Sequence, residues 1–392
     1  MIVKPLVIDQ RTIRTENRKK ILQLLIRKRE LTIPEISREI DISTPTITKN
    51  INQLMIEGMA EEAGVSESTG GRKPMVIKFL PDAYYSVGVE FALEYVRIIL
   101  TNLDTSIKAD RVIRNVNYHD LASLMTYIHR EINSIFLEKE IPVERVLGVG
   151  ISIPGTVNEE TAFVKIAPNI GVRNVDFRPY EDLFQLPLFL ENDANAAAIA
   201  ELVLGIAKEM RNLVFLCVLP QGIGAGIVVD GHLYKGKNKR AGEISHTTIA
   251  SHGKICSCGR RDCWELYASG NTLLTRYQEK TGKVLGSLEE FFAVLKRYEL
   301  TAVKVFDEYL DYLALGIQNL ILIQDPHYVI LGGVISPYEE ILLEPLKKKV
   351  FVENNFYDMQ DVQVMCSTLK ENASILGASL LPFEKIFALH DM

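Results

Sequence analysis

Four potential metal ligands lie close together in the second half of the chain. His246 is followed by Cys256, Cys258 and Cys263, with the spacing H-x9-C-x-C-x4-C. One imidazole and three thiols match a closed Cys3His zinc site, which leaves no position for a reacting water. The pattern therefore predicts a structural zinc ion rather than a hydrolytic one. His252 lies nearer to the first thiol, so spacing alone does not choose between the two histidines, and cysteines that only pack are the alternative.

Carboxylates next to this cluster could accept hydrogen bonds from hydroxyl groups. Glu243 precedes His246 by three residues, and Glu265 follows Cys263 by two. A solvated surface carboxylate is the alternative for each. A third acidic segment, Glu191-Asn192-Asp193, ends an apolar run predicted as a buried strand, and a carboxylate with an amide can bind adjacent hydroxyls of a polyol. Because Asn and Asp also begin helices, N-capping is the alternative for this pair.

A glycine-rich segment, QGIGAGIVVDG, contains Gly222, Gly224 and Gly226. Such a turn could direct backbone N–H groups toward an anion. No helical pattern follows it directly, and hairpin turns also use glycine. The segment alone is therefore weak evidence for an anion site.

The first eighty residues differ in charge from the rest. They contain 14 Lys and Arg against 10 Asp and Glu, whereas the remainder contains 30 against 40. Apolar spacing predicts an amphipathic helix over 16–29. Thr32 and Glu35 form a capping-box pattern before a short helix over 33–40, and Ser43 is placed to cap a third helix. This order of helices is the outline of a helix-turn-helix.

The third helix is predicted to read DNA, with an ordinary three-helix bundle as the alternative. Its exposed face would carry short hydroxyl side chains and a lysine, which can bond base edges or phosphates. Residues 59–79 predict two short strands around a loop, as in a wing, and the loop offers two more cations. A solvated linker is the alternative for this loop. The predicted DNA contacts are Ser43, Thr44, Thr46, Thr48, Lys49, Arg72 and Lys73.

Length and composition limit the class of protein. A chain of 392 residues with 47% hydrophobic and 24% charged residues predicts a globular protein of two or three domains. No apolar run approaches the roughly 20 residues that span a bilayer, and the N-terminus lacks the pattern of a signal peptide. Five cysteines in a chain of this length do not form a disulfide framework. We expect a cytoplasmic protein with reduced thiols and no membrane contact.

The remainder of the chain alternates between strand and helix patterns from Ala83 onward. Antiparallel strands followed by strand-helix units occur twice, which predicts two α/β lobes with a cleft between them. Ligands of such sheets collect at the carboxyl ends of strands. The predicted domains are a head over 1–80, a first lobe over 81–192, and a second lobe over 193–392 whose C-terminal helix returns to the first lobe.

Several of these motifs together resemble the ROK family of bacterial repressors and sugar kinases, specifically its DNA-binding members. The segments are AGEISH, CSCGRRDCWE, ENDANAAA, PQGIGAG and GGRKP, and the likeness extends from about residue 15 to 385. The stretch CSCGRRDCWELYAS is most similar to the xylose-responsive repressors of the family. The resemblance implies a winged helix-turn-helix before a two-lobed, actin-like, hexokinase-type body of the ribonuclease-H-like class, assembled as a homodimer or tetramer. It implies zinc on His246, Cys256, Cys258 and Cys263, and a sugar pocket lined by Asn192, Asp193, Glu243, His246 and Glu265.

One segment departs from the kinases of this family. Their first hairpin holds an Asp-x-Gly-Gly-Thr turn that wraps ATP phosphates, whereas the corresponding run here is Glu90-Phe91-Ala92-Leu93-Glu94. A phosphate needs backbone N–H donors unshielded by Cβ atoms, and a nearby carboxylate repels it. Asp193 matches the general base of the kinases, but without a bound nucleotide it would remain only as a vestigial base that binds a hydroxyl.

The resulting hypothesis is a repressor and not an enzyme. A monosaccharide, xylose or a related sugar, would bind in the cleft and release the protein from its operator. An ATP-dependent sugar kinase that carries a DNA-binding head is the main alternative. A protein partner that replaces the sugar is another.

Overall fold

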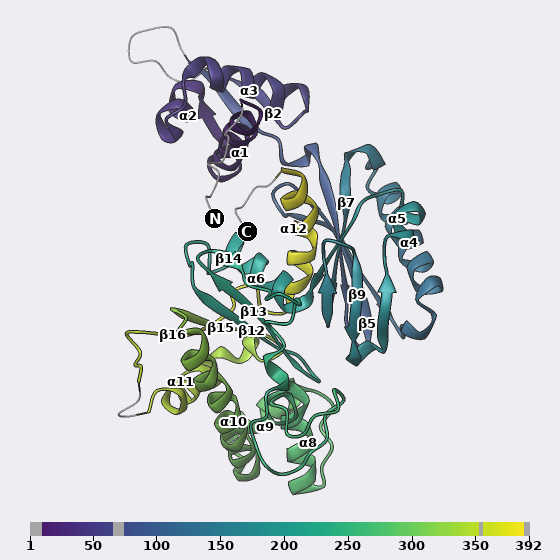
Figure 1. Cartoon of the computed structure of the whole chain (residues 1–392), viewed down its shortest axis with the longest axis vertical. Coiled ribbons are helices and arrows are strands. Elements are labelled where there is room, and N and C mark those ends of the chain that lie inside the picture. The colour runs from purple at the N-terminus through teal and green to yellow at the C-terminus, as the bar shows by residue number, and fades with distance from the viewer. Residues whose placement is uncertain (1–9, 66–73, 353–355, 388–392) are drawn as a thin grey trace, which may run out of the picture.

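The computed structural model describes residues 10–65, 74–352 and 356–387, and it consists of a small head joined to a larger body with two main sheets (Figure 1). Two of the predicted DNA contacts, Arg72 and Lys73, lie outside the described residues.

The head combines three helices with a three-stranded antiparallel sheet of order β1-β3-β2. The capping box predicted at Thr32 is present, because the Glu35 N–H donates to Oγ1 of Thr32 and the Thr32 N–H donates to Oε2 of Glu35. The strands expected for a wing pair as β2 and β3, and β1 adds a third strand that the sequence analysis did not predict. The elements are α1 (Gln10–Lys28), β1 (Glu30–Thr32), α2 (Ile33–Ile40), α3 (Thr44–Ile56), β2 (Ala60–Val65) and β3 (Met75–Phe79).

The first main sheet has the order β11-β7-β4-β5-β6. Its first three strands along the chain form the predicted antiparallel meander, and β7 and β11 then extend the sheet in parallel to β4. A small separate sheet, β8 to β10, was not predicted. The elements are β4 (Tyr85–Phe91), β5 (Tyr95–Asn102), β6 (Ile107–Arg114), α4 (Leu121–Glu138), β7 (Val146–Ile153), β8 (Thr156–Asn158), β9 (Phe163–Ala167), β10 (Val172–Asp176), α5 (Pro179–Phe184) and β11 (Leu188–Asn192).

The second main sheet has the order β14-β13-β12-β15-β16, with β12, β15 and β16 parallel. Helices α8 to α11 enclose a large hydrophobic core against it. The elements are α6 (Asp193–Val203), β12 (Leu213–Val218), β13 (Ile223–Val229), β14 (His232–Leu233), α7 (Glu265–Ala268), α8 (Gly270–Thr281), α9 (Leu288–Lys296), α10 (Leu300–Gln324), β15 (Tyr328–Gly333), α11 (Glu339–Val350), β16 (Gln363–Cys366) and α12 (Ala373–Phe387).

Two helices join the sheets. The last helix, α12, packs on β4 and β7 of the first sheet, and Figure 1 shows α4 and α5 on the opposite face. Helix α6 packs on β12 and β13 of the second sheet and also crosses α12. The crossing is very close: a Cβ atom on Gly377 would lie 1.8 Å from the carbonyl oxygen of Ala196. Only a glycine therefore lets the two backbones reach this distance.

We predict that Gly377→Ala destabilises the body. The added methyl group would force the backbones of α6 and α12 apart, and such overpacking costs about 1–3 kcal/mol even though alanine favours helix by about 1 kcal/mol. Urea unfolding followed by far-UV circular dichroism measures the change, with the exposed Lys385→Ala on the same helix as the control. An unfolding midpoint for Gly377→Ala equal to that of the native chain would contradict this account of the crossing.

Candidate functional site

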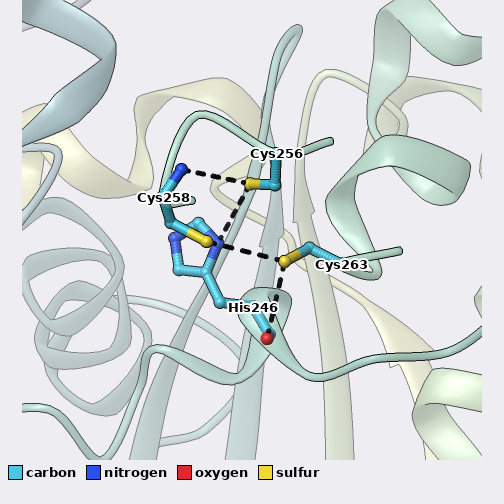
Figure 2. A group of neighbouring side chains, drawn as sticks. All are labelled: His246, Cys256, Cys258 and Cys263. Carbon is cyan, nitrogen blue, oxygen red and sulfur yellow. Dashed lines mark hydrogen bonds between the residues drawn. The ribbon is translucent and has the colours of Figure 1, made fainter. Parts of the chain in front are cut away.

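The structure brings the four predicted metal ligands together. Figure 2 shows His246, Cys256, Cys258 and Cys263 around a common centre, and one ligand atom from each lies within 4.8 Å of the others. Nδ1 of His246 is 3.6 Å from Sγ of Cys256, and the sulfurs of Cys258 and Cys263 are also 3.6 Å apart. Tetrahedral bonds of about 2.3 Å to zinc place two sulfurs about 3.8 Å apart, so the cluster fits such an ion.

The choice between the two histidines follows from this geometry. Nε2 of His252 lies 3.3 Å from the hydroxyl of Tyr312, and His252 does not belong to the metal-compatible cluster. Burial raises the pKa of the Cys263 thiol to about 11, so a nearby cation is needed to hold it as a thiolate near neutral pH. The residues present are therefore suited to a metal ion.

Short local elements hold the cluster. His246 ends a single 3-10 turn, Ile244–His246, and a β-bridge pairs Thr248 with Cys263. Trp264 then fixes the end of the loop, because its ring is buried and its Nε1 donates to the carbonyl oxygen of Tyr312 on α10 at 2.9 Å. The tryptophan thus ties the cysteine-rich loop to the helical core.

The two carboxylates predicted beside the metal lie next to the cluster. Oε1 of Glu265 is 3.0 Å from Sγ of Cys256 and 3.5 Å from Nδ1 of His246. Oε2 of Glu243 is 3.9 Å from Nε2 of His246, and its Oε1 accepts a hydrogen bond from Thr156 at 3.0 Å. Because Thr156 follows the first sheet, Glu243 links the metal loop to that side of the body.

Asn192 and Asp193 stand where β11 ends and α6 begins. Oδ1 of Asn192 accepts from the N–H groups of Ala194 and Asn195, and its Nδ2 donates to the carbonyl oxygen of Gly155 at 3.0 Å. Asn192 is therefore the N-cap of α6, the alternative considered for this pair, and only one amide N–H stays available. The Asp193 side chain is almost fully buried, and burial, together with the negative charges of Glu243 and Glu90, raises its pKa to about 7.

A cavity of about 840 Å³ opens at the carboxyl ends of the strands, between the two main sheets. Of the predicted sugar ligands, Asp193 is the only one among the described residues that line it. Glu265 lies just behind the wall: a Cβ on Gly222, which lines the cavity, would be 3.5 Å from Oε2 of Glu265 and 3.4 Å from Nδ2 of Asn169. Glu265 is thus close to the cavity wall through Gly222.

Two polar residues of this cavity, Asn169 and Glu90, were not predicted as ligands. Asn169 lies in a loop whose spacing carries no readable pattern, yet its amide reaches the wall. Glu90 is only 8% exposed and accepts a hydrogen bond from the hydroxyl of Tyr95 at 3.3 Å. Burial raises the pKa of Glu90. Glu90 begins the run that departs from the kinase phosphate turn, but no pattern marks it or Asn169 as a sugar ligand, because segments far apart in the sequence bring them together.

The glycine-rich segment has a different role from the one considered first. Gly224 and Gly226 lie in β13, where Cβ atoms would meet the methyl groups of Ala194 and Ala198 at 2.9 and 2.6 Å. These two glycines let α6 pack on the strand and do not form an anion cradle. Gly222 alone lines the cavity.

Glu191 is used in an ion-pair network rather than as a free hydroxyl ligand. Nζ of Lys235 lies 2.5 Å from Oε2 of Glu191 and 2.8 Å from Oε1 of Glu159. Lys239 adds a contact of 2.9 Å to the same oxygen of Glu159. Both lysines follow β14 of the second sheet, whereas Glu191 lies in β11 of the first sheet and Glu159 follows β8 of the small sheet. The network therefore crosses between the two sides.

The predicted DNA contacts around α3 lie at the N-terminus of this helix, at the N-cap and within its first six residues. Ser43, Thr44 and Lys49 are exposed, whereas Thr46 and Thr48 are half-buried. Ser43 occupies the N-cap position, but its hydroxyl lies 3.0 Å from that of Thr46 and makes no capping bond to the backbone. The capping bond expected from Ser43 is therefore absent, and the hydroxyl of Thr48 donates to the carbonyl oxygen of Thr44.

The head contacts the body through both polar and apolar groups. Arg29 of the head forms an ion pair with Asp104 of the body. Hydrophobic residues of the head, of α6 and of α12 form one continuous cluster. No helix in the described ranges combines the length and the apolar character that crossing a bilayer requires.

Comparisons with known proteins cover both parts of the chain. The model of the ROK family matches residues 86–385, and a model for winged helix-turn-helix DNA-binding matches residues 14–61. The chain is 29% identical to the xylose repressor of Bacillus subtilis (strain 168) over 390 residues, which is 95% of this chain and 96% of the repressor. It is 31% identical to the glucokinase of Thermotoga maritima over 265 residues, which is 61% of this chain and 80% of the kinase.

A solved structure gives the same result. A ROK family transcriptional regulator, a homologue of the Escherichia coli MLC protein, has a TM-score of 0.81 and 25% identity, and the match covers 96% of this chain and 98% of that one. The fold expected from the resemblance is confirmed. The chain therefore belongs to the ROK family, with a winged helix-turn-helix in front of the actin-like, hexokinase-type body.

Proposed function

We propose that this chain is a transcription repressor that binds double-stranded operator DNA and releases it when a monosaccharide binds in the cleft. Its similarity to a xylose repressor over nearly the whole of both chains supports this function and favours xylose or a related sugar as the effector. The protein acts in the cytoplasm, where the operator is. Two copies form a dimer, or four a tetramer, so that two α3 helices lie about 34 Å apart on a pseudo-palindromic site.

The path of α6 is the observation that carries this proposal. The helix begins at Asp193 in the cleft, and Ile199 and Ala200 in its second half belong to the hydrophobic cluster that includes Ile77 and Phe79 of the head. A ligand that contacts the first residue of α6 therefore acts on a helix that belongs to one continuous hydrophobic cluster with α12 and the DNA-binding part. To shift the ratio of operator-binding to released conformation from 99:1 to 1:99, the sugar must bind the released conformation more tightly by about 5.5 kcal/mol.

In this proposal Asp193 accepts hydrogen bonds from the sugar, and Glu243 and Glu265 do so from the opposite side. His246 and the free amide hydrogen of Asn192 complete the set carried over from the family resemblance. Asn169 adds a donor that is already at the cavity wall. Carboxylates and amides of this kind suit a polyol, because each can pair with neighbouring hydroxyls.

We assign Zn²⁺ to His246, Cys256, Cys258 and Cys263. When bound, the ion supplies the positive charge that holds these ligands in one structural site. The chain's own residues do the positioning: Trp264 anchors the loop on α10, and this anchor places Glu265 beside the cavity wall. The cluster therefore serves the sugar site indirectly.

The kinase alternative is weaker for a reason visible at the first hairpin. The N–H of Ala92 donates to the carbonyl oxygen of Tyr95 at 3.0 Å, so it is not available to a phosphate. Leu93 and Glu94 form the rest of the turn and line the same cavity. A phosphate there would find a carboxylate in place of free backbone donors. We therefore propose that Asp193 binds a hydroxyl without activating it for phosphoryl transfer.

Operator release by a sugar tests the function. We expect at least one monosaccharide of a panel that includes xylose and glucose to lower the fluorescence anisotropy of a labelled operator fragment selected with the protein itself. Asp193→Asn should weaken this effect about 10- to 100-fold, because it removes a charged hydrogen-bond acceptor, and DNA affinity without sugar should stay unchanged. In the native chain the sugar affinity should fall as the pH drops through about 7, where Asp193 takes up a proton.

The exposed Asp230→Asn is the matched control for Asp193→Asn. Sugar release that Asp193→Asn leaves unchanged would argue against the assigned pocket. Turnover of ATP with any sugar of the panel would support the kinase instead.

Metal content distinguishes the two histidines. We expect the native chain to contain one zinc ion, His246→Ala to lose it, and His252→Ala to keep it, because only His246 lies in the cluster. Metal analysis after dialysis measures this, and sugar-induced release of DNA should disappear together with the metal. Equal zinc content in the two variants would refute the ligand assignment.

Lys49 tests the DNA-binding surface. Lys49→Ala should weaken operator binding at every sequence and lower the slope of log affinity against log salt concentration by about one, as expected for one lost phosphate contact. The exposed Lys304→Ala on α10 serves as the control. An unchanged salt slope would place Lys49 outside the interface.

A further inference from the structure

A second, smaller pocket lies behind the metal cluster, on the side of the helices α7, α8 and α10. Its volume is about 420 Å³, and three basic side chains, His252, Lys254 and Arg276, line it together with Tyr267 and Tyr312. The sugar site and the DNA-binding head use none of these residues. The basic and aromatic residues that line this pocket therefore suggest a separate ligand.

The aromatic rings hold the basic groups in place. The rings of Tyr267 and Tyr312 lie 4.7 Å apart with an angle of 30° between them. The guanidinium carbon of Arg276 lies 4.8 Å from the ring centre of Tyr312, and Nζ of Lys254 lies 5.0 Å from that of Tyr267. Cation–π contacts of this kind restrict where each positive charge can be.

A buried carboxylate fixes the loop over these rings. Asp262 accepts hydrogen bonds from the N–H groups of Gly253 and Lys254, at 2.7 and 3.0 Å, and from the hydroxyl of Tyr267. Its charge is directed to these three donors rather than into the pocket. The backbone of Lys254 is thus held beside Tyr267 before any ligand arrives.

Among the described residues, neither Lys254 nor Arg276 forms an ion pair with a carboxylate. Nη1 of Arg276 is buried and has no hydrogen-bond partner in the same part of the chain. The ammonium of Lys254 contacts the ring of Tyr267. An unsatisfied buried donor costs about 1–3 kcal/mol, and more when it is charged. The positive charge of Arg276 is therefore left without a compensating acceptor among the described residues beside the pocket.

Two carboxylates at the edge of the pocket do not supply that acceptor. Glu308 pairs with Lys280 at 2.5 Å, and Asp311 pairs with Lys349, also at 2.5 Å. Each is therefore held by a lysine outside the group of residues that line the pocket. The N–H donors of the basic side chains are therefore not used by these two carboxylates.

We propose that this pocket is a binding site for a tetrahedral oxyanion, the phosphate group of either inorganic phosphate or a phosphate monoester. The guanidinium of Arg276 and the ammonium of Lys254 supply two positive charges at the pocket. The hydroxyl of Tyr312 can donate to a phosphate oxygen while it accepts from Nε2 of His252, which lies 3.3 Å away. The site does not depend on the proposed repressor function.

Its position gives the site a connection to the metal cluster. The short helix α7 carries Glu265 toward the cysteine ligands and Tyr267 toward the basic pocket. The segment from His252 to Tyr267 contains all three cysteine ligands. An anion that binds Lys254 and Arg276 together joins this segment to α8, and it should therefore stabilise the metal loop.

Calorimetric titration of the metal-loaded full chain with inorganic phosphate tests the site. We expect saturable binding that Arg276→Gln weakens at least about tenfold, the loss expected for a charged hydrogen bond. Arg297→Gln, an exposed arginine at the end of α9, is the matched control and should leave the affinity unchanged. Lys254→Gln is the second variant in case Arg276→Gln does not fold, because Lys254 is exposed and its removal leaves the core intact.

The same titration with glucose 6-phosphate separates the two sources. Tighter binding than inorganic phosphate identifies an ester as the occupant, and equal affinity identifies the free anion; both support the site. Performing the titrations in the Asp193→Asn background removes the contribution of the cleft, so failure of the proposed sugar site would not affect the result. Absence of saturable heat with both probes, or equal affinity in Arg276→Gln and Arg297→Gln, would overturn the proposal.

Discussion

The close crossing of α6 and α12 is the contact on which the arrangement of the body depends. α12 covers β4 and β7 of the first sheet, and α6 covers β12 and β13 of the second. The distance between these two helices therefore determines how far apart the two sheets lie. Gly377 makes the crossing possible, and the alanines of α6 allow strands and helix to approach from the other side. Ala194, Ala197 and Ala198 are fully buried. The alanine-rich sequence of α6 is therefore required by packing against β13 on one side and α12 on the other.

The parts of the molecule that sequence predicted well are those whose geometry is local. A Cys3His cluster within one loop, a capping box with its two residues three apart, and a meander of adjacent strands each depend on spacing along the chain. The family resemblance added the order of the lobes and the winged head. Even here the local signal had two meanings: Asn192 was expected as a sugar ligand with capping as the alternative, and its oxygen caps α6 with two hydrogen bonds.

The parts that sequence did not predict depend on contacts between distant segments. The ion pairs of Lys235 with Glu159 and Glu191 join residues that are 76 and 44 positions apart. Nothing near Glu191 in the sequence distinguishes a paired carboxylate from a free one. Asn169 reaches the cavity wall only because a small sheet, β8 to β10, positions its loop, and those strands are too short to stand out by periodicity. Residue spacing also left two histidines open; the family resemblance implied His246, and the position of His252 beside Tyr312 agrees with that choice.

The polar links between the two sides of the body bear on how a ligand could act at a distance. Thr156 with Glu243, and Lys235 with Glu191, already connect the sides next to the start of α6. In the proposed function, a sugar that bonds Asp193 and Glu265 would therefore change the angle between the sheets about these links, rather than their separation there. α6 begins at this pivot and ends in the cluster shared with the head, so a small rotation at Asp193 becomes a larger displacement at its far end. Differential contacts at the pivot, and not the size of the cleft, would then determine how strongly a given sugar alters DNA binding.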